Sequence, residues 1–442
     1  KISANFGAFL YGIALGWSNG VNDDIVDRQD FKFYVSAYHF AWIVALMPLG
    51  GACSSAFCGV MRKHIGTKIT VFIYGIPMVV GYGLLLFAVN VEMLMIGRFL
   101  IGTSAGCYIF IPVLYIGEIA SKEIRGLLLS TFFFMVYCGV TFVFSMGHYA
   151  SLMSLHVISG ALPLLYSTVF IFLPESPPML VSKNRIEEAK ETLMFLRGST
   201  FNVEAEIDDL KIRHQATAER KSFLKVFSVK STRKALILIV CMFFFLQMSG
   251  ITLIPFYSLM IFTEAGFQNH AEFLTILVAS MQALSSLFAL ATVDRYGRRI
   301  LLIGSTAAMF VSLTGVATYF LLKELKFDVT KFMLAPFILF CLYVISFSIG
   351  LAPVTYVLLG EIFLQEAKVY VAPISKFLNF MFAFTVAITF PLLTGVLGFG
   401  TTFYLYAFLN LLGTFFAIFF VPETKGASLA EIQSILGMDW RL

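Results

Sequence analysis

Long apolar stretches recur along almost the whole chain, and they restrict the folds that it can adopt. A helix that crosses the hydrocarbon core of a bilayer needs about 20 mostly apolar residues. Twelve stretches meet this requirement: 3–21, 34–60, 69–90, 93–117, 127–148, 152–173, 235–262, 271–293, 300–322, 333–359, 371–397 and 401–421. We therefore expect an all-α membrane protein with twelve transmembrane helices.

The composition leads to the same class of protein. Only 13% of the 442 residues are charged, whereas an ordinary soluble chain has about a quarter. The 49 phenylalanines are more than one water-soluble domain of this length can bury. This composition excludes a disordered chain, a disulfide scaffold and a cytosolic enzyme. The six cysteines all lie within apolar stretches, so we expect them to be packing residues.

The first apolar stretch predicts a true span rather than a signal peptide. It contains Gly12, Gly16 and Gly20 and shows no cleavage-site pattern. Because the sequence begins at Lys1 and not at a methionine, we also expect part of the native N-terminus to precede it.

Lysine and arginine are distributed unequally between the two sides of these spans. An even number of spans places both termini and the loops after even-numbered spans on one face. Outside the long polar stretch 174–234, that face carries twelve Lys and Arg residues and the other face carries five. Because positively charged loops stay in the cytoplasm, we expect a multi-pass protein of the cell membrane with both termini cytoplasmic.

The long polar stretch divides the chain into two sets of six spans. We expect an N-terminal bundle over 1–173, a cytoplasmic helical linker over 174–234, a C-terminal bundle over 235–422 and a cytoplasmic tail over 423–442. Within the linker, 184–196 and 203–218 have helical spacing and acidic first turns. The alternative is a solvated linker without regular structure.

Three charged landmarks occur in the same order in each set of spans. Arg62 to Lys68, Glu118 to Arg125 and Pro174 to Pro177 follow spans two, four and six. Asp294 to Arg299, Glu361 to Lys368 and Pro422 to Lys425 follow spans eight, ten and twelve. Two six-helix repeats that rock around a site at their junction are a known transporter plan, and this duplication predicts that plan.

These landmarks place acids and bases together at the cytoplasmic ends of helices, where they predict a gating network. We expect its ion pairs to join the two bundles and to favour the state closed on the cytoplasmic side. The alternative is a set of basic anchors that reach the membrane surface. The predicted network consists of Arg98, Glu118, Arg125, Glu175, Asp294, Arg295, Arg298, Glu361, Lys368 and Glu423.

Arg98 differs from the rest because it lies inside span four. An unpaired charge there costs about 2.5–3.5 kcal/mol by insertion scales. We expect Arg98 to pair with an acidic end group or to extend to the membrane surface, in a structural role.

The landmarks together resemble the sugar porter family of the major facilitator superfamily along essentially the whole chain. The resemblance implies the superfamily fold, with twelve helices in two six-helix bundles, and movement of a hexose or disaccharide by alternating access. Leu15-Gly-Trp17 and Leu196-Arg-Gly198 resemble the insect branch around the facilitated trehalose transporters. The matching motifs are Gly97-Arg98, Glu118…Arg125-Gly126, Pro174-Glu-Ser-Pro177, Gln247-x-Ser-Gly-Ile251, Asp294-Arg-x-Gly-Arg-Arg299, Gly360-Glu361-Ile-Phe363 and Pro422-Glu-Thr-Lys-Gly426.

The resemblance also indicates the residues that bind the solute. Several of them depart from the family pattern: Phe133 and Leu246 stand where the family has glutamines, and an unpaired sugar hydroxyl costs about 1–3 kcal/mol. We therefore expect a pocket more apolar than a typical hexose site. The alternative role for its glutamines is a hydrogen bond between helices. The predicted substrate-binding residues are Gln247, Gln282, Thr252, Tyr257, Tyr356, Asn379, Ser348 and Phe133.

Spans seven and ten each contain a glycine and a proline near the middle, Gly250 with Pro255 and Gly350 with Pro353. Proline removes a backbone hydrogen bond, so we expect both helices to be loosened there. Loosened helices often gate transporters, which makes Tyr257 a gate candidate, and ordinary kinking is the alternative.

The sequence favours facilitated diffusion of a sugar such as trehalose or a hexose. Proton-coupled sugar porters carry an aspartate in span one after an aromatic residue, whereas Trp17 is followed here by Ser18. A proton symporter and a non-transporting nutrient sensor of the same fold are the alternatives. We expect no enzymatic activity, cofactor, metal site or nucleic-acid partner. The expected partners are a small-molecule sugar and the bilayer, and a monomer suffices. His39, His148 and His156 are expected to be solvated near the outer face.

Overall fold

The computed structural model describes residues 5–21, 33–120, 122–197, 202–218, 227–363 and 365–437. The side chains of Arg125 and Asp294, two residues of the predicted charge network, lie outside this description. Within the described ranges every regular element is a helix, as the apolar stretches predict.

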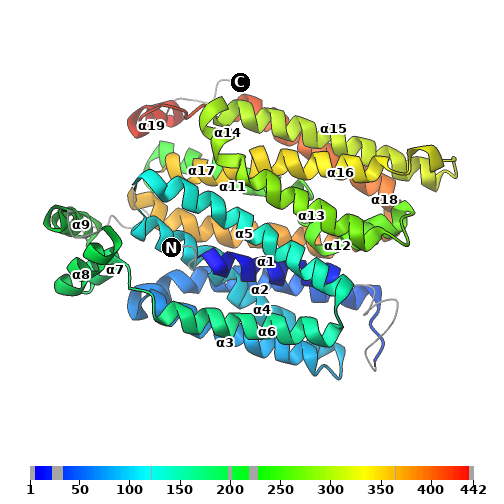
Figure 1. Ribbon diagram of the computed structural model, residues 1–442. Helices are drawn as coiled ribbons and strands as arrows, with labels where there is room; N and C mark the ends of the chain where they lie inside the picture. The colour runs from blue at the N-terminus through cyan, green and yellow to red at the C-terminus, as the bar shows by residue number, and fades with distance from the viewer. Residues whose placement is uncertain are drawn as a thin grey trace.

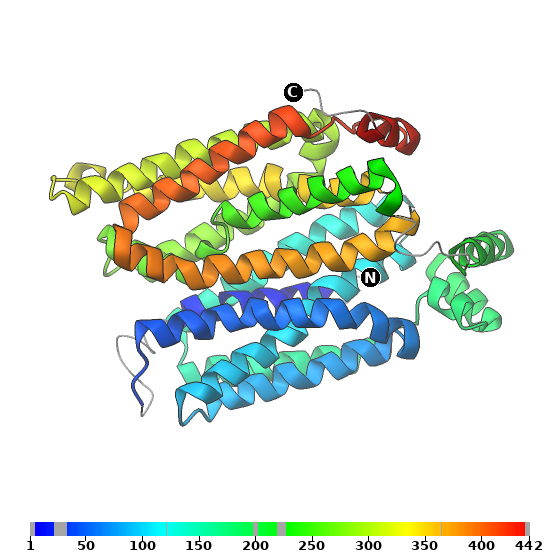
Figure 2. The same ribbon diagram turned by 180° about the vertical axis from the view of Figure 1, so that it is seen from behind.

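Six long helices form the N-terminal half and lie in the lower part of Figure 1. They are α1 (Phe6–Gly20), α2 (Ala37–Ile65), α3 (Thr67–Leu86), α4 (Val91–Ile119), α5 (Lys122–Tyr149) and α6 (Leu152–Ile171). The C-terminal half lies in the upper part, and its helices are interrupted more often; Figure 2 shows both halves from behind. It consists of α11 (Lys230–Met248), α12 (Leu253–Ala265), α13 (Ala271–Leu287), α14 (Ala289–Tyr296), α15 (Arg298–Glu324), η3 (Thr330–Phe332), α16 (Ala335–Ser346), η4 (Phe347–Leu351), α17 (Ala352–Glu361) and α18 (Gln365–Phe420).

The twelve predicted spans all correspond to helical segments. Nine helical segments of the described residues are long and apolar enough to cross a membrane. Two further spans, α1 and α13, are shorter, with 15 and 17 described residues. The twelfth is found inside α18, which contains two predicted spans joined at Gly398, where φ is +80°.

The helices run between two ends of the molecule, which we call the linker end and the far end. Three short helices project from the linker end: α7 (Pro177–Ser182), α8 (Ile186–Arg197) and α9 (Val203–Ala218) (Figure 1). The last helix, α19 (Leu429–Gly437), lies at the same end (Figure 2).

The described part of the linker is a folded unit rather than a solvated connection. Helices α8 and α9 confirm the two helices predicted there. Arg197 donates from Nη1 to the Ile119 carbonyl at 3.1 Å, which ties the linker to the end of α4. It also pairs with Glu206 at 3.4 Å. The three helices share a small apolar core formed by Leu180, Val181, Ala189, Leu193 and Ile207.

Glycines allow the backbones of neighbouring helices to touch inside the N-terminal half. A Cβ on Gly102 of α4 would lie 2.1 Å from the Met47 carbonyl oxygen of α2, and a Cβ on Gly50 would lie 2.2 Å from the Phe99 carbonyl oxygen. Small residues at helix contacts are a general means of packing helices inside membranes. The α2–α4 contact therefore depends on these two glycines having no side chain.

The seventh predicted span is broken in its middle, as its glycine and proline predict. A turn at 249–252 separates α11 from α12, and Gly250 adopts a φ of +91° there. The Ser249 carbonyl, which this turn leaves without a helical partner, accepts hydrogen bonds from the Tyr343 hydroxyl at 3.0 Å and the Asn410 amide at 3.1 Å. Span ten is also irregular, because the π-helical turn η4 interrupts it.

Candidate functional site: a cavity between the two halves

A cavity lies between the two halves of the protein. It encloses about 830 Å³ of unfilled space, counting the open space at its mouth. Nine of its 22 lining residues belong to the N-terminal half and thirteen to the C-terminal half. A solute bound there would contact both halves at once.

Three hydrogen-bonded side chains form the main polar part of the cavity wall. Gln247, at the end of α11, donates from Nε2 to Oδ1 of Asn379 at 2.9 Å. Its Oε1 accepts a hydrogen bond from the Thr252 hydroxyl at 2.6 Å. All three side chains are buried. Because a side-chain amide offers two donor hydrogens and an acceptor oxygen, the cluster retains capacity for the hydroxyl groups of a solute.

Most of the remaining wall is apolar. Only seven of the 22 lining residues carry a hydrogen-bonding side chain. Phe133 of α5 packs against Tyr356 of α17 with ring centroids 5.2 Å apart, and Leu246 lies beside Gln247 in the lining. Gln282 of α13 adds a further amide near the Tyr137 hydroxyl. The wall therefore offers aromatic faces and a few amides.

The structure brings six of the eight predicted substrate-binding residues to this cavity and leaves two outside its lining. Tyr257 donates its hydroxyl to the Ala387 carbonyl of α18 at 2.8 Å, so it braces α12 within its own half. Ser348 is buried in η4, and its hydroxyl has no hydrogen-bond partner among the described residues.

The sequence analysis missed three residues near the cavity. Tyr11 and Tyr137 line it, but tyrosines in apolar spans carry no signal that separates them from packing residues. Lys376 of α18 lies one helical turn before Asn379, and its Nζ sits 4.1 Å from the centroid of the Tyr356 ring. A lysine eleven residues inside a helix was a detectable signal, because charges inside spans are rare and functional.

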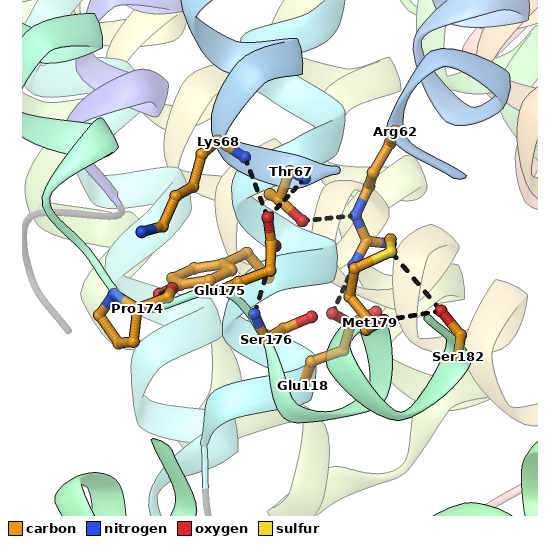
Figure 3. Close-up of polar contacts among 10 residues, drawn as sticks. Arg62, Thr67, Lys68, Glu118, Pro174, Glu175, Ser176, Met179 and Ser182 are labelled. Carbon is orange, nitrogen blue, oxygen red and sulfur yellow. Dashed lines mark hydrogen bonds and ion pairs between the residues drawn. The ribbon is translucent and has the colours of Figure 1, made fainter. Parts of the chain in front are cut away.

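At the linker end of the N-terminal half, two carboxylates hold the ends of three helices together (Figure 3). Glu118, at the end of α4, pairs with Arg62 near the end of α2. Glu175 accepts a hydrogen bond from the Thr67 amide at 3.0 Å, at the first residue of α3. A carboxylate at a helix N-terminus pairs with amides that have no helical partner. The chain after α6 is thereby fixed to the start of α3.

The C-terminal half repeats this arrangement. Glu361, at the end of α17, pairs with Arg298 at 2.8 Å. Glu423 accepts hydrogen bonds from the backbone amides of Arg298 at 3.0 Å and Arg299 at 3.1 Å, at the start of α15. The repeat differs in one respect: Arg298 follows the helix-joining Gly297, whereas its counterpart in the N-terminal half, Arg62, precedes Gly66.

Among the described residues, the recorded ion pairs at the linker end do not join the two halves as expected. Each recorded pair at the linker end lies within one half or within the linker. Lys368 and Arg295 also stay in the C-terminal half: Lys368 lies near Glu361, and the Arg295 carbonyl accepts a hydrogen bond from Lys425 at 2.9 Å. The repeated helix-end charges are satisfied inside each repeat, which the linear sequence does not reveal.

Two sets of recorded polar contacts between the halves lie toward the far end instead. Oδ1 of Asn19, near the end of α1, accepts hydrogen bonds from the Leu259 amide at 2.7 Å and the Ser258 hydroxyl at 3.2 Å in α12. His148, at the end of α5, contacts the carboxylate of Glu272 at the start of α13. These contacts hold the far end closed. His148 is exposed as predicted, whereas His156 is buried against Trp17.

The expected environment of Arg98 is also wrong. Its side chain is fully buried, with no acidic partner among the described residues and no path to the surface. Nη1 donates to the Ala14 carbonyl at 2.9 Å, Nε donates to the Ile43 carbonyl at 3.4 Å, and the guanidinium carbon lies 4.7 Å from the Trp17 ring centroid. Arg98 therefore joins α1, α2 and α4 and takes no part in the network at the linker end.

Glu423 gives a pH-dependent prediction. Partial burial raises the pKa of this carboxyl, but hydrogen bonds from the Lys425, Arg298, Arg299 and Thr424 amides outweigh burial and hold the pKa below its usual range. The group therefore stabilises the fold above the unfolded-state pKa of about 4.3, and this contribution is lost as the pH falls through the lowered pKa. We expect Glu423→Gln to lower the melting temperature at pH 7 and to lower it less at pH 4. An equal loss at both pH values would contradict this assignment.

Comparison with known proteins places this geometry in a family. Residues 2–436 match the family described as "Sugar (and other) transporter". The facilitated trehalose transporter Tret1 of Bombyx mori is 31% identical over 438 residues, which cover 98% of this chain and 86% of that protein. Tret1 of Drosophila grimshawi is also 31% identical over 438 residues, but this chain spans only 47% of its length.

Solved structures share the fold. The inward-open xylose transporter XylE from E. coli matches with a TM-score of 0.80 at 21% identity, over 98% of both chains. The proton:xylose symporter XylE bound to 6-bromo-6-deoxy-D-glucose matches with a TM-score of 0.79 at 21% identity, over 100% of this chain and 98% of that one. These matches confirm the predicted major facilitator superfamily fold of two six-helix bundles. The chain therefore belongs to the sugar transporter family, whose members are multi-pass membrane transporters and not enzymes.

Proposed function

We propose that this protein is a facilitative transporter of a sugar, trehalose or a hexose, that works by alternating access. The observation that carries the proposal is the cavity between the halves, with the Gln247–Asn379–Thr252 cluster on its wall. Its buried amides suit solute hydroxyls, and the similarity to insect facilitated trehalose transporters supports the same class of solute. The six lining residues from the predicted set are the proposed substrate-binding residues.

Uniport is favoured over proton symport by the charges inside the membrane. Apart from Glu272 at the start of span eight, no predicted span contains an aspartate or a glutamate. A sugar carrier of this kind is expected to couple to protons through a carboxylate that changes protonation along the path. The XylE structures belong to a proton symporter, so symport remains the alternative that an experiment should exclude.

We also propose the domain plan and its orientation. The halves 1–173 and 235–422 are the moving units, with the linker 174–234 and the tail 423–442 on the cytoplasmic side of the cell membrane. The excess of positive charges at the linker end supports this orientation. The far end then faces outward, and one chain supplies both halves of the site, so a monomer suffices.

The proposal is tested by uptake into proteoliposomes that contain the purified protein. We expect saturable uptake of labelled trehalose or glucose that stops at equal concentrations on both sides. Uptake accompanied by acidification of the lumen would establish symport instead. Protection of the protein against heat by sugars, without any flux, would indicate a sensor, and the absence of both would refute the proposal.

Asn19→Ala should open the far end. The substitution removes the acceptor of the Leu259 amide and the Ser258 hydroxyl, and an unpaired buried group costs about 1–3 kcal/mol. The closed state should lose population about 5- to 150-fold relative to the open one. Spin labels at the exposed positions Tyr149 and Phe273 should then report a longer distance. An unchanged distance distribution, equal to that of the exposed-surface control Glu187→Gln, would contradict the role of Asn19.

A further inference from the structure

Lys376 places an ammonium group deep inside the C-terminal half. The residue is only 9% exposed, and it lies within a segment of α18 that is apolar enough to cross the membrane. Among the described residues the structure records no ion pair for it. Its recorded contact is the face of the Tyr356 ring, 4.1 Å from Nζ. A buried ammonium without a counter-charge is costly, so this position needs a reason.

The contacts of Lys376 connect it to the cavity. Tyr356, which holds the ammonium, lines the cavity, and so does Asn379, one helical turn further along α18. The lysine side chain has a flexible four-carbon stem, so Nζ can exchange the ring for a group of a bound solute. Because α18 runs from the linker end, Lys376 lies on the linker-end side of Asn379.

We propose that the preferred solute of this cavity is a sugar acid, a polyhydroxylated ring that carries a carboxylate, and that Lys376 supplies its counter-charge. The amides of Gln247 and Asn379 bind the ring hydroxyls, and the aromatic faces of Phe133 and Tyr356 cover the ring. The inference rests on the proposed transport function and goes beyond the neutral sugars named there. It also gives a reason for the mostly apolar wall, because an ion pair supplies binding that the missing amides do not.

The carboxylate fits this position better than a second positive group or a neutral hydroxyl. An ammonium attracts an anion strongly where water is excluded, and charge-assisted hydrogen bonds are about twice as strong as neutral ones. Tyr356 keeps the ammonium stabilised while the cavity is empty, because an aromatic face attracts a cation. The site can thus exist in an empty and a filled form.

The test compares three ligands of nearly equal shape on the full chain in nanodiscs: D-glucuronate, its uncharged methyl ester and D-glucose. Affinity is measured by calorimetry, and uptake of the same labelled compounds is measured in proteoliposomes. We expect glucuronate to bind at least about 100-fold more tightly than the ester or glucose, as expected for a buried charge pair. Lys376→Met should remove this preference while glucose binding changes less than threefold.

Two further variants test whether the preference for glucuronate depends on the positive charge at position 376. Lys376→Arg keeps the charge and should retain most of the preference for glucuronate. Lys331→Met removes an exposed lysine of η3 and should change nothing. A melting temperature close to that of the wild type shows that each variant is folded.

Several outcomes would overturn the inference. Glucose or trehalose could bind as tightly as glucuronate, or the preference for glucuronate could survive Lys376→Met. Competition of glucuronate by chloride or phosphate alone at similar affinity would indicate an inorganic anion site instead. Sugar uptake without any effect of charge would refute the inference and leave the proposed function intact. The absence of binding and uptake of every sugar would refute both.

Discussion

Replacing Gly102 with valine is expected to prevent the protein from folding. The new Cβ would lie 2.1 Å from the Met47 carbonyl oxygen, and a backbone atom inside a helix cannot move aside as a side chain does. Overpacking against a deformable neighbour costs about 1–3 kcal/mol, so a collision with backbone should exceed about 4 kcal/mol. We expect loss of the monodisperse peak in size-exclusion chromatography of the detergent-solubilised protein.

Gly83→Val is the matched control. Gly83 lies inside α3, and a Cβ there would meet no atom within 4 Å. The control should elute and melt like the wild type. Gly102→Ala should fall between the two, because it adds the colliding atom without the further methyl groups. Equal melting temperatures for Gly102→Val and Gly83→Val would show that α2 and α4 do not touch at this point.

The second large effect is expected at the cavity, where Gln247→Ala should abolish saturable uptake. The substitution removes one buried amide and leaves the Asn379 oxygen and the Thr252 hydroxyl without their partner. Each unpaired group costs about 1–3 kcal/mol, and the solute loses its own bonds to Gln247 as well. We expect solute affinity and uptake to fall at least about 100-fold.

Three variants separate binding from folding. Gln247→Met keeps a similar volume and should lose uptake with little change in melting temperature. Gln282→Ala should have a smaller effect, because Gln282 lies outside the three-residue cluster. Gln268→Ala, on the exposed loop before α13, should leave uptake unchanged. Full uptake after combined substitution of Gln247, Gln282 and Asn379 would remove these residues from the site.

The spans and their breaks were predictable because each depends on residues close together in the sequence. A run of apolar residues specifies a span wherever its neighbours lie, and a glycine or proline weakens its own helix. The turn at Gly250 and the π-helical turn η4 were predictable on these grounds. The folded linker was predictable from helical spacing, apart from the six-residue helix α7.

The partners of charged residues were less predictable, because they depend on contacts between distant segments. The sequence shows Arg98 inside a span but not the carbonyls of Ala14 and Ile43 that receive its hydrogen bonds. It also shows the charged landmark from Arg62 to Lys68. This landmark does not reveal that Arg62, which precedes Gly66, pairs with Glu118.

The amides of the cavity were predictable from the sequence, but the positive charge beside it was not. Gln247 and Asn379 lie 132 residues apart, and only their resemblance to family positions indicated that they share a site. Lys376 lies within a span and belongs to no loop, so the distribution of positive charges between the loops does not reveal it. Its place beside Tyr356 follows from packing between α17 and α18.

The turn between α11 and α12 determines how α12 of the C-terminal half moves when the far end opens. Because the Ser249 carbonyl accepts hydrogen bonds from α16 and α18, the turn is fixed to the rest of the C-terminal half. The recorded hydrogen bonds between α12 and α1 are those to Asn19, whereas Tyr257 ties α12 to α18 and the Ala265 carbonyl ties it to α15. Opening toward the far end would thus carry α12 along with the rest of its half and separate it from α1 with the loss of the two bonds to Asn19.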